Sequence, residues 1–134
     1  MRTAAAAKNL PLVIDIRIGQ RQLFFAALAG TSSDNSDWVR RKSNSVLRFH
    51  KCTYRMNREF EGSTHVFGPA RGVDVMDYAK DGGGFPITIK GTGVVGAITV
   101  SGIPQRDDHG FVVEQLCAYL KKDHAKLALG PETK

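Results

Sequence analysis

Two β-branched segments joined by glycines, within residues 82–102, constrain the fold of this chain more than any other part of its sequence. Residues 86–90, PITIK, alternate apolar and polar side chains, as a half-buried strand does. Residues 94–100, VVGAITV, are again β-branched and too short to form a helix before the Ser-Gly-Ile-Pro that follows. Gly91 and Gly93 supply the positive φ that a tight turn needs. The stretch therefore predicts a β-hairpin.

The same stretch contains GTGVVG at residues 91–96, which matches the G-x-G-x-x-G spelling of a dinucleotide-binding loop. In such a loop the glycines follow a strand and open a helix, whose N-terminus meets a pyrophosphate. Here a strand follows the glycines instead. The acidic residue expected about 20 positions later would fall inside the last predicted helix. We therefore predict a hairpin turn and no dinucleotide site.

A second hairpin is predicted from residues 12–18 and 21–28, which are apolar-rich segments separated by Gly19 and Gln20. A helix is predicted to open at Gln105, because residues 105–108 resemble an N-cap cluster and apolar residues then recur at helical spacing. Two hairpins with helices between and after them indicate an α+β fold.

The chain length of 134 residues predicts one domain over residues 1–134. Residues 3–9 suit the end of a helix, and residues 125–134 are expected to form a flexible tail. A short helix is predicted over residues 73–80. The Gly-rich stretch around it is a candidate rim or lid, since such connections often carry function.

A long helix is predicted over residues 37–56. At 100° per residue, Trp38, Phe49 and Met56 fall on one apolar face, opposite most of the basic side chains. Lys42 breaks this pattern because it projects from the apolar face. We expect its amine to snorkel to the rim, and the alternative is a specific anionic partner.

The formal net charge of +6 favours anionic partners. Seven cations and no acid lie between Trp38 and Arg58, so this helix presents either a solvated basic face or a surface for carboxylates, phosphates or nucleic acid. Nucleic acid is the weakest of these partners, because no exposed aromatic residues are interleaved with the cations. The seven cations are Arg40, Arg41, Lys42, Arg48, Lys51, Arg55 and Arg58.

Several classes of protein are not indicated. No apolar run approaches the length of about 20 residues that spans a membrane, and the N-terminus lacks a signal-peptide pattern, so we predict a cytoplasmic protein. Cys52 and Cys117 lack metal or redox spacing and are expected to be buried thiols.

Four histidines are present, and no histidine pairs with another His or Cys at i,i+4, so no metal site is predicted. His50, on the apolar edge of the long helix, is either a core residue or a ligand at a pocket wall. His65 lies in a loop, where it could serve as a mobile ligand. His109 follows two acids in a first helical turn, where the helix dipole lowers its pKa and the acids raise it. We expect a packing or capping role for His109.

Several motifs together resemble the haem-degrading, HbpS-like superfamily, and more closely its small cytoplasmic branch of uncharacterised proteins. The similarity covers residues 10–120. It is carried by residues 83–87 and 93–102, by Pro104 with Asp108-His109, and by segments of the first hairpin and of the long helix, namely residues 14–17, 24–28, 38–42 and 46–49.

The resemblance implies a profilin-like α+β fold, with an antiparallel sheet of about five strands and the long helix packed on one side. It also implies homo-oligomers built from dimers. Relatives begin with a longer N-terminal helix, of which residues 1–9 look like a remnant, and a shortened start would leave apolar surface that needs a partner. The haem ligands of relatives align with no motif here, so none is transferred.

Two functions are compatible with these observations. The first is a small-ligand protein of the haem-binding or haem-degrading type, with haem as its candidate cofactor. An anionic ligand would then lie near the basic helix 38–58, with its carboxylates at Arg41, Lys42 or Arg48 and donors among His50, His65 and His109. The second is a non-enzymatic oligomeric scaffold or adaptor for protein partners.

Overall fold

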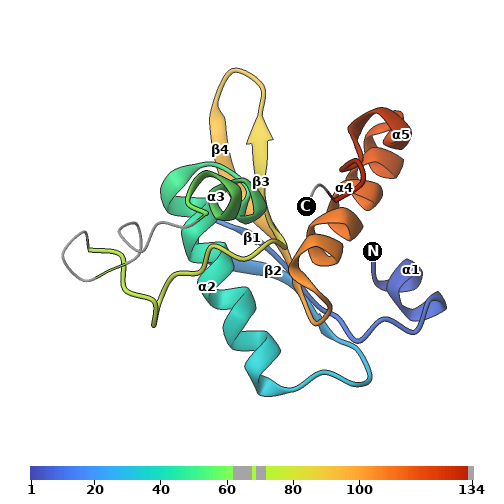
Figure 1. Cartoon of the computed structure of the whole chain (residues 1–134), viewed down its shortest axis with the longest axis horizontal. Helices are drawn as coiled ribbons and strands as arrows, with labels where there is room; N and C mark the ends of the chain where they lie inside the picture. Colours follow the sequence, from blue (N-terminus) through green and yellow to red (C-terminus); the bar gives the residue numbers. More distant parts are fainter. Residues whose placement is uncertain (62–67, 69–71, 133–134) are drawn as a thin grey trace.

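The computed structural model describes residues 1–61, 68 and 72–132. Its centre is a four-stranded antiparallel sheet with the strand order β2-β1-β4-β3 (Figure 1). The α+β fold and both hairpins are confirmed, whereas a count of about five strands and the profilin-like description are not. The strands are β1 (Val13–Ile18), β2 (Arg21–Ala27), β3 (Gly84–Ile89) and β4 (Gly93–Ser101).

The first two glycines of the G-x-G-x-x-G spelling lie at the β3–β4 turn. Gly91 and Gly93 have φ values of 83° and 114°, which glycine adopts more readily than other residues. Residues 93–101 then continue as a strand paired with both β1 and β3. The glycines therefore turn a hairpin and do not open a helix.

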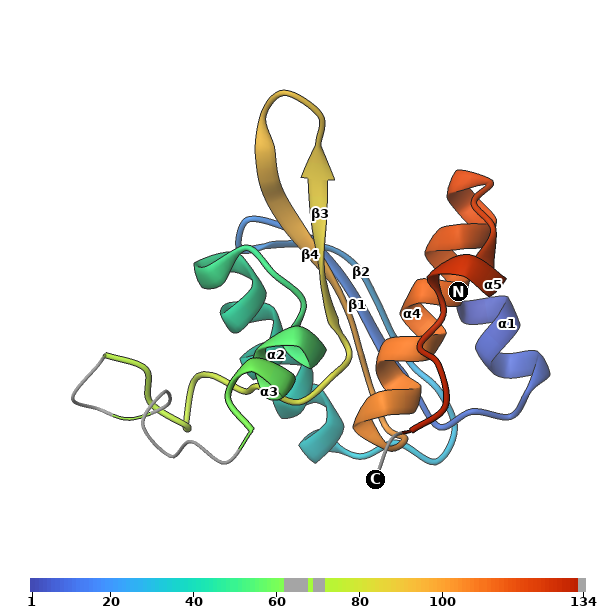
Figure 2. The ribbon, with the colours of Figure 1, turned by 45° about the horizontal axis from the view of Figure 1, so that its top comes forward.

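Helices cover both faces of the sheet (Figure 2). Helix α2 (Ser33–Phe49) packs on one face, and α1 (Arg2–Ala7) with α4 (Gln105–Leu120) packs on the other. The alternation of side chains along β1 and β4 divides the core between these faces. Leu12, Ile14 and Val100 lie with α1 and α4, whereas Thr99 faces α2 and shares a hydrogen bond with Ser43.

The predicted helix over residues 37–56 is wrong as a single element. Helix α2 ends at Phe49, because His50 adopts the left-handed conformation with φ 57°, and α3 (Thr53–Glu59) begins after a short bend. The bend lets the buried hydroxyl of Thr53 accept a hydrogen bond from the N–H of Gly84 at 2.9 Å. This contact anchors α3 to the start of β3, which a straight helix would not reach.

The short helix predicted over residues 73–80 is also wrong, because the chain forms turns there. Asp74 accepts a hydrogen bond from the N–H of Met76, and Arg40 and Asn44 of α2 donate to the carbonyls of Met76 and Asp77. Side chains of α2 therefore satisfy backbone groups that a helix would have paired internally.

Two further helices complete the described chain. The helix predicted near the N-terminus is α1, and a fifth helix, α5 (His124–Leu127), lies where the flexible tail was predicted to begin. The flexibility of residues 125–134 stays a prediction. None of the helices in the described ranges is long and apolar enough to cross a bilayer.

Candidate functional site

A buried ion pair joins α2 to the corner where β4 turns into α4. The amine Nζ of Lys42 lies 3.1 Å from Oδ2 of Asp108 and also donates to the carbonyl of Val100 at 3.1 Å. The two side chains are only 3% and 2% exposed. The expectation that Lys42 snorkels to the rim is wrong, and the alternative of a specific anionic partner is confirmed.

The corner places Asp108 opposite Lys42. Pro104 precedes α4, so Asp108 lies in the first turn and its Oδ1 accepts from the N–H of Ile103 at 3.2 Å. Gly83 makes room for the amine, since a Cβ there would lie 2.8 Å from Nζ of Lys42 and 2.4 Å from the carbonyl of Val100. Asp108, expected to be part of an N-cap cluster, is instead the buried partner of a helix on the other face of the sheet.

Burial opposes the charged form of both partners. Loss of water raises the pKa of Asp108 to about 6, although the positive charge of Lys42 and the N–H groups of Ile103 and Gly102 act the other way. Burial likewise lowers the pKa of the Lys42 amine, against the attraction of Asp108 and Asp81. Burial therefore disfavours the charged form of both partners, and acidification through about pH 6 neutralises Asp108.

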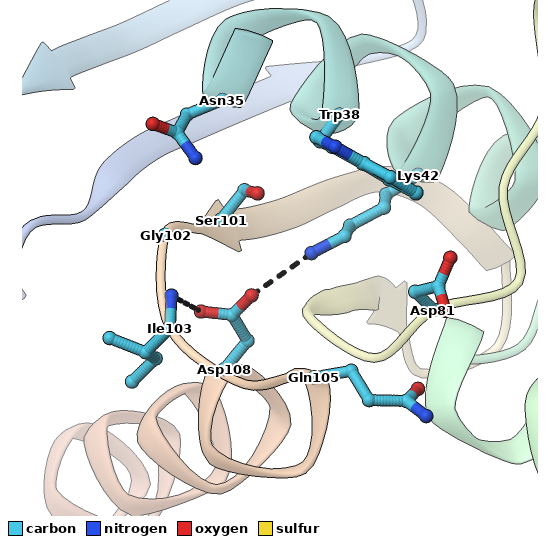
Figure 3. Close-up of a pocket in the computed structure, with 9 residues that line it drawn as sticks. All are labelled: Asn35, Trp38, Lys42, Asp81, Ser101, Gly102, Ile103, Gln105 and Asp108. Atoms are coloured by element: carbon cyan, nitrogen blue, oxygen red, sulfur yellow. Dashed lines mark hydrogen bonds and ion pairs between the residues drawn. The ribbon is translucent and has the colours of Figure 1, made fainter. Parts of the chain in front are cut away.

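The Lys42–Asp108 pair forms one wall of a cavity of about 410 Å³, which we call the polar cavity. In Figure 3 the side chains come from α2, from the end of β4, from the start of α4 and from Asp81 just before β3. Trp38 supplies an aromatic wall, and Ser101 is buried with its hydroxyl toward the opening. The lining residues are Asn35, Trp38, Lys42, Asp81, Ser101, Gly102, Ile103, Gln105 and Asp108.

A second cavity of about 690 Å³, which we call the apolar cavity, lies between the end of α1, one side of α4 and the C-terminal segment. Leu10, Phe111 and Leu129 contribute apolar surface, and His124 contributes an imidazole. Ile103 lines both cavities, so the β4–α4 corner separates them. The apolar cavity is also lined by Lys8, Pro104, Arg106, Asp107, Gly110, Glu114, Ala128, Gly130, Pro131 and Glu132.

The cations predicted to bind an anionic ligand are engaged with groups of this chain. Arg41 pairs with Asp37 at 3.0 Å and stacks 4.0 Å from the ring centre of Trp38. Arg48 donates to the carbonyl of Gly72 at 2.6 Å. The cations of residues 38–58 form ion pairs with acids that flank this stretch, which are Asp37, Glu59 and Glu61, and with the distant Asp77 and Asp108.

The predicted histidines do not meet in one place. His50 is exposed at the C-terminal end of α2, whereas His109 is buried on α4 and stacks on Tyr54 with 4.9 Å between ring centres. His65 lies outside the described residues. The packing role expected for His109 fits this geometry, and its Nδ1 lacks a hydrogen-bond partner in the described chain. Of the five predicted ligand residues that the structure describes, only Lys42 lines the polar cavity.

His109 predicts a measurable pH dependence of stability. Burial, followed by the nearby charge of Arg106, lowers the pKa of His109 from its ordinary value of 6.5. The unfolded chain therefore takes up this proton more readily than the folded chain, and acidification from about pH 7.5 to about pH 5.5 disfavours folding. His109→Phe keeps a ring beside Tyr54 but removes the proton. We expect its free energy of unfolding in urea to fall less than that of the wild type over this range, whereas parallel pH profiles would contradict this role.

Sequence reasoning missed the acids and the aromatic wall of the polar cavity. Asp108 and Asp81 come from segments far from α2 in sequence, and only the folded sheet brings them to Lys42. Trp38 was placed on the apolar face of the long helix, and it is partly buried and lines the opening. The one available signal was Lys42 itself, because a lysine on an apolar helix face either snorkels to the rim or has a buried anionic partner.

The two cavities offer different donors to a cofactor. Haem iron in proteins takes axial ligands from His, Cys, Met or Tyr, and the polar cavity is lined by none of these. The apolar cavity includes His124 and a larger apolar surface, which suits a planar hydrophobic group. No cluster of three or more His, Cys, Asp or Glu side chains that could hold a metal ion occurs in the described part of the chain.

Comparison with solved structures supports the fold. The crystal structure of the Ybr137w protein matches with a TM-score of 0.76 at 28% identity, over 90% of this chain and 71% of that one. HbpS matches with a TM-score of 0.67 at 19% identity, over 88% of this chain and 79% of that one. The complex of PduOC with haem matches with a TM-score of 0.66 at 15% identity, over 80% and 77%. At these identities the last two show a shared fold alone.

Comparison with sequences identifies the family. A family model described as haem degrading protein HbpS-like matches residues 1–117. The UPF0303 protein mlr5144 of Mesorhizobium japonicum is 48% identical over 132 residues, which cover 98% of this chain and 79% of that protein. The UPF0303 protein BCAN_A1444 of Brucella canis is 47% identical over 129 residues, which cover 96% and 76%. This chain therefore belongs to the HbpS-like family of haem-degrading proteins, among its UPF0303 members.

Proposed function

We propose that this protein binds haem in the apolar cavity between α1, α4 and the C-terminal segment. The observation that carries the proposal is the combination of apolar surface and an imidazole in a cavity of about 690 Å³, within the size range of cofactor pockets. The family's description points to haem, and a structural neighbour, PduOC, was crystallised in complex with haem.

In this proposal His124 is the axial donor, because it is the His, Cys, Met or Tyr residue in the lining of the apolar cavity. Bound haem would supply an iron centre that takes this ligand and whose reactivity depends on the surrounding polarity. Leu10, Phe111 and Leu129 would exclude water from the porphyrin faces.

Two cations lie near enough to meet the carboxylates of such a ligand. Lys8 lines the apolar cavity at its rim, where it pairs with Glu114 at 3.4 Å, and its amine is largely exposed. Arg106 lines the same cavity and donates to the hydroxyl of Tyr54 at 2.7 Å and to the carbonyl of Gly130. A weak, exposed pair such as Lys8–Glu114 can be exchanged for a ligand carboxylate at little cost.

A haem site along the basic helix, as expected from the sequence, is the alternative location. There the ligand would lie along the basic helix, with Arg41, Lys42 and Arg48 at its carboxylates and His50, His65 or His109 as donor. The ion pairs of Arg41 and Lys42 within the chain weigh against it, since a ligand would have to displace Asp37 and the buried Asp108. His50 is nevertheless exposed and needs a direct test.

Titration with hemin distinguishes these locations. We expect the wild-type protein to produce a saturable shift of the Soret band, and His124→Ala to weaken binding by at least about tenfold, because the iron loses its protein ligand. His50→Ala is the matched control and should bind as the wild type does. A loss caused by His50→Ala alone would move the site to the basic helix, and a weak, non-saturating change in the wild type would rule out haem binding.

The alternative function, an oligomeric scaffold for protein partners, is favoured by strand β2. This strand lies at the edge of the sheet, and Leu23, Phe24 and Phe25 on it are 54%, 39% and 44% exposed. An apolar edge strand invites pairing with another chain, and a two-fold pairing of identical edges closes a dimer. In this alternative, homo-oligomers built from such dimers present the surface that holds other proteins.

Sedimentation velocity at several concentrations tests the role of β2. We expect the wild type to sediment as a dimer or larger species, and Phe24→Lys to shift the distribution toward the monomer, because it buries a charge in the pairing surface. Tyr119→Lys changes a residue that is 83% exposed on α4 and serves as the control. A wild-type monomer at all concentrations would exclude this scaffold.

A further inference from the structure

The polar cavity has the properties of a second ligand site, separate from the proposed haem cavity. It lies on the other side of the β4–α4 corner, and Ile103 is the residue that lines both cavities. Its polar groups converge from four segments of the chain (Figure 3). Packing of α2 on the sheet therefore leaves a space that its own side chains do not fill.

Three polar groups of this cavity are not fully used within the described chain. An ammonium group has three N–H donors, and Lys42 directs two of them to Val100 and Asp108, which leaves one. Ser101 is only 4% exposed, and no described group makes a hydrogen bond to its hydroxyl, which points toward the cavity in Figure 3. Asp81 makes no hydrogen bond or ion pair with the described residues, although it is near enough to raise the pKa of Lys42.

The charges of the lining residues favour a positively charged ligand. Asp108 is neutralised by Lys42 across 3.1 Å, so Asp81 contributes an unbalanced negative charge. Trp38 adds an aromatic wall, and aromatic faces attract organic cations. Arg41 stacks on one face of this ring at 4.0 Å, and its charge is balanced by Asp37 at 3.0 Å.

We infer that the polar cavity binds a small organic ammonium ion that also carries a hydroxyl or carbonyl oxygen. Its ammonium group pairs with Asp81 beside Trp38, and its oxygen accepts from Lys42 and contacts the hydroxyl of Ser101. The cavity volume of about 410 Å³ limits the ligand to a small metabolite. An anion is disfavoured here, because it would meet the carboxylates of Asp81 and Asp108.

Three probes of similar size and different charge test this inference. Ethanolamine is the cation, ethylene glycol is the neutral compound and glycolate is the anion, each added at constant ionic strength and pH. Trp38 is the single tryptophan of the chain, so intrinsic tryptophan fluorescence reports on this cavity directly. Ethanolamine is expected to give a saturable change with a Kd on the order of millimolar, as suits so small a molecule.

Two variants complete the experiment. Asp81→Asn should weaken ethanolamine binding at least about tenfold, because it removes the ion-pair partner without changing the shape of the cavity. Asp77→Asn is the matched control: Asp77 is an exposed acid that pairs with Arg40 outside the cavity, and its loss should leave binding unchanged. Binding of glycolate at least as tight as that of ethanolamine, no saturable change with ethanolamine, or an unchanged affinity in Asp81→Asn would each overturn the inference. The hemin titration is independent of these outcomes.

Discussion

Replacing Lys42 by methionine is expected to lower the free energy of unfolding by about 3–5 kcal/mol near pH 7, because it strands the buried carboxylate of Asp108. Since burial has already raised the pKa of Asp108 to about 6, the unpaired carboxylate can become neutral by taking up a proton. The defect of Lys42→Met should therefore shrink on acidification toward about pH 4.5. Urea unfolding at several pH values measures both effects.

The double variant Lys42→Met/Asp108→Leu distinguishes the free-energy cost of an unpaired buried charge from the net contribution of the ion pair to stability. Well-packed apolar replacements of a buried ion pair are often neutral or stabilising by about 1–4 kcal/mol, so we expect the double variant to recover the stability lost in Lys42→Met. Arg40→Met removes exposed pairs with Asp37 and Asp77 and should cost less than about 1 kcal/mol. A double variant as unstable as Lys42→Met would show that the pair contributes net stability.

Among glycine-to-alanine substitutions at the described positions, Gly102→Ala is expected to be the most destabilising. A Cβ at Gly102 would lie 1.8 Å from the carbonyl oxygen of Pro11, and its φ of 151° is one that only glycine adopts readily. Gly102 and the carbonyl of Pro11 both belong to the backbone. Relieving the contact would therefore move the start of β1 away from the end of β4. We expect a loss of about 3 kcal/mol or more, or failure to obtain folded protein.

Gly110→Ala is the matched control for this substitution. Gly110 lies inside α4 without a positive φ, and a Cβ there would meet nothing within 4 Å. Alanine should stabilise the helix by about 1 kcal/mol. Thermal unfolding of the two variants should therefore shift in opposite directions, and equal shifts would contradict the close approach of Gly102 to Pro11.

The strands were predictable because the sequence signals for the strands and for their turns lie within the same short segments. Alternating β-branched residues with Gly91 and Gly93 between them identify β3 and β4, and the same reasoning identifies β1 and β2 across Gly19. Local sequence decides such hairpins, since turn geometry and side-chain alternation act over a few residues.

The break between α2 and α3 was not predictable, because its cause is a distant contact. The apolar face of residues 37–56 is continuous in helical spacing, yet Thr53 must reach the N–H of Gly84. His50 then takes a left-handed conformation that its residue type adopts only occasionally. Tertiary structure overrides helix periodicity at this point.

The candidate site was predictable only in part, for a related reason. A lysine within an apolar face signals a buried charge, but the sequence does not say which of 13 acids neutralises it. Asp108 lies 66 positions away and belongs to a helix on the opposite face of the sheet. Of the acids that pair with the cations of residues 38–58, Asp77 and Asp108 come from distant segments. Asp37, Glu59 and Glu61 instead flank the basic stretch.

The β4–α4 corner separates two cavities, and we propose that haem binds in the apolar one. Crystals of the protein loaded with hemin, measured at the iron absorption edge, test it most directly. We predict a single anomalous iron peak beside His124, between α1 and α4, with the polar cavity free of iron. An iron peak beside His50 on the basic helix, or within the polar cavity next to Lys42, would contradict the account.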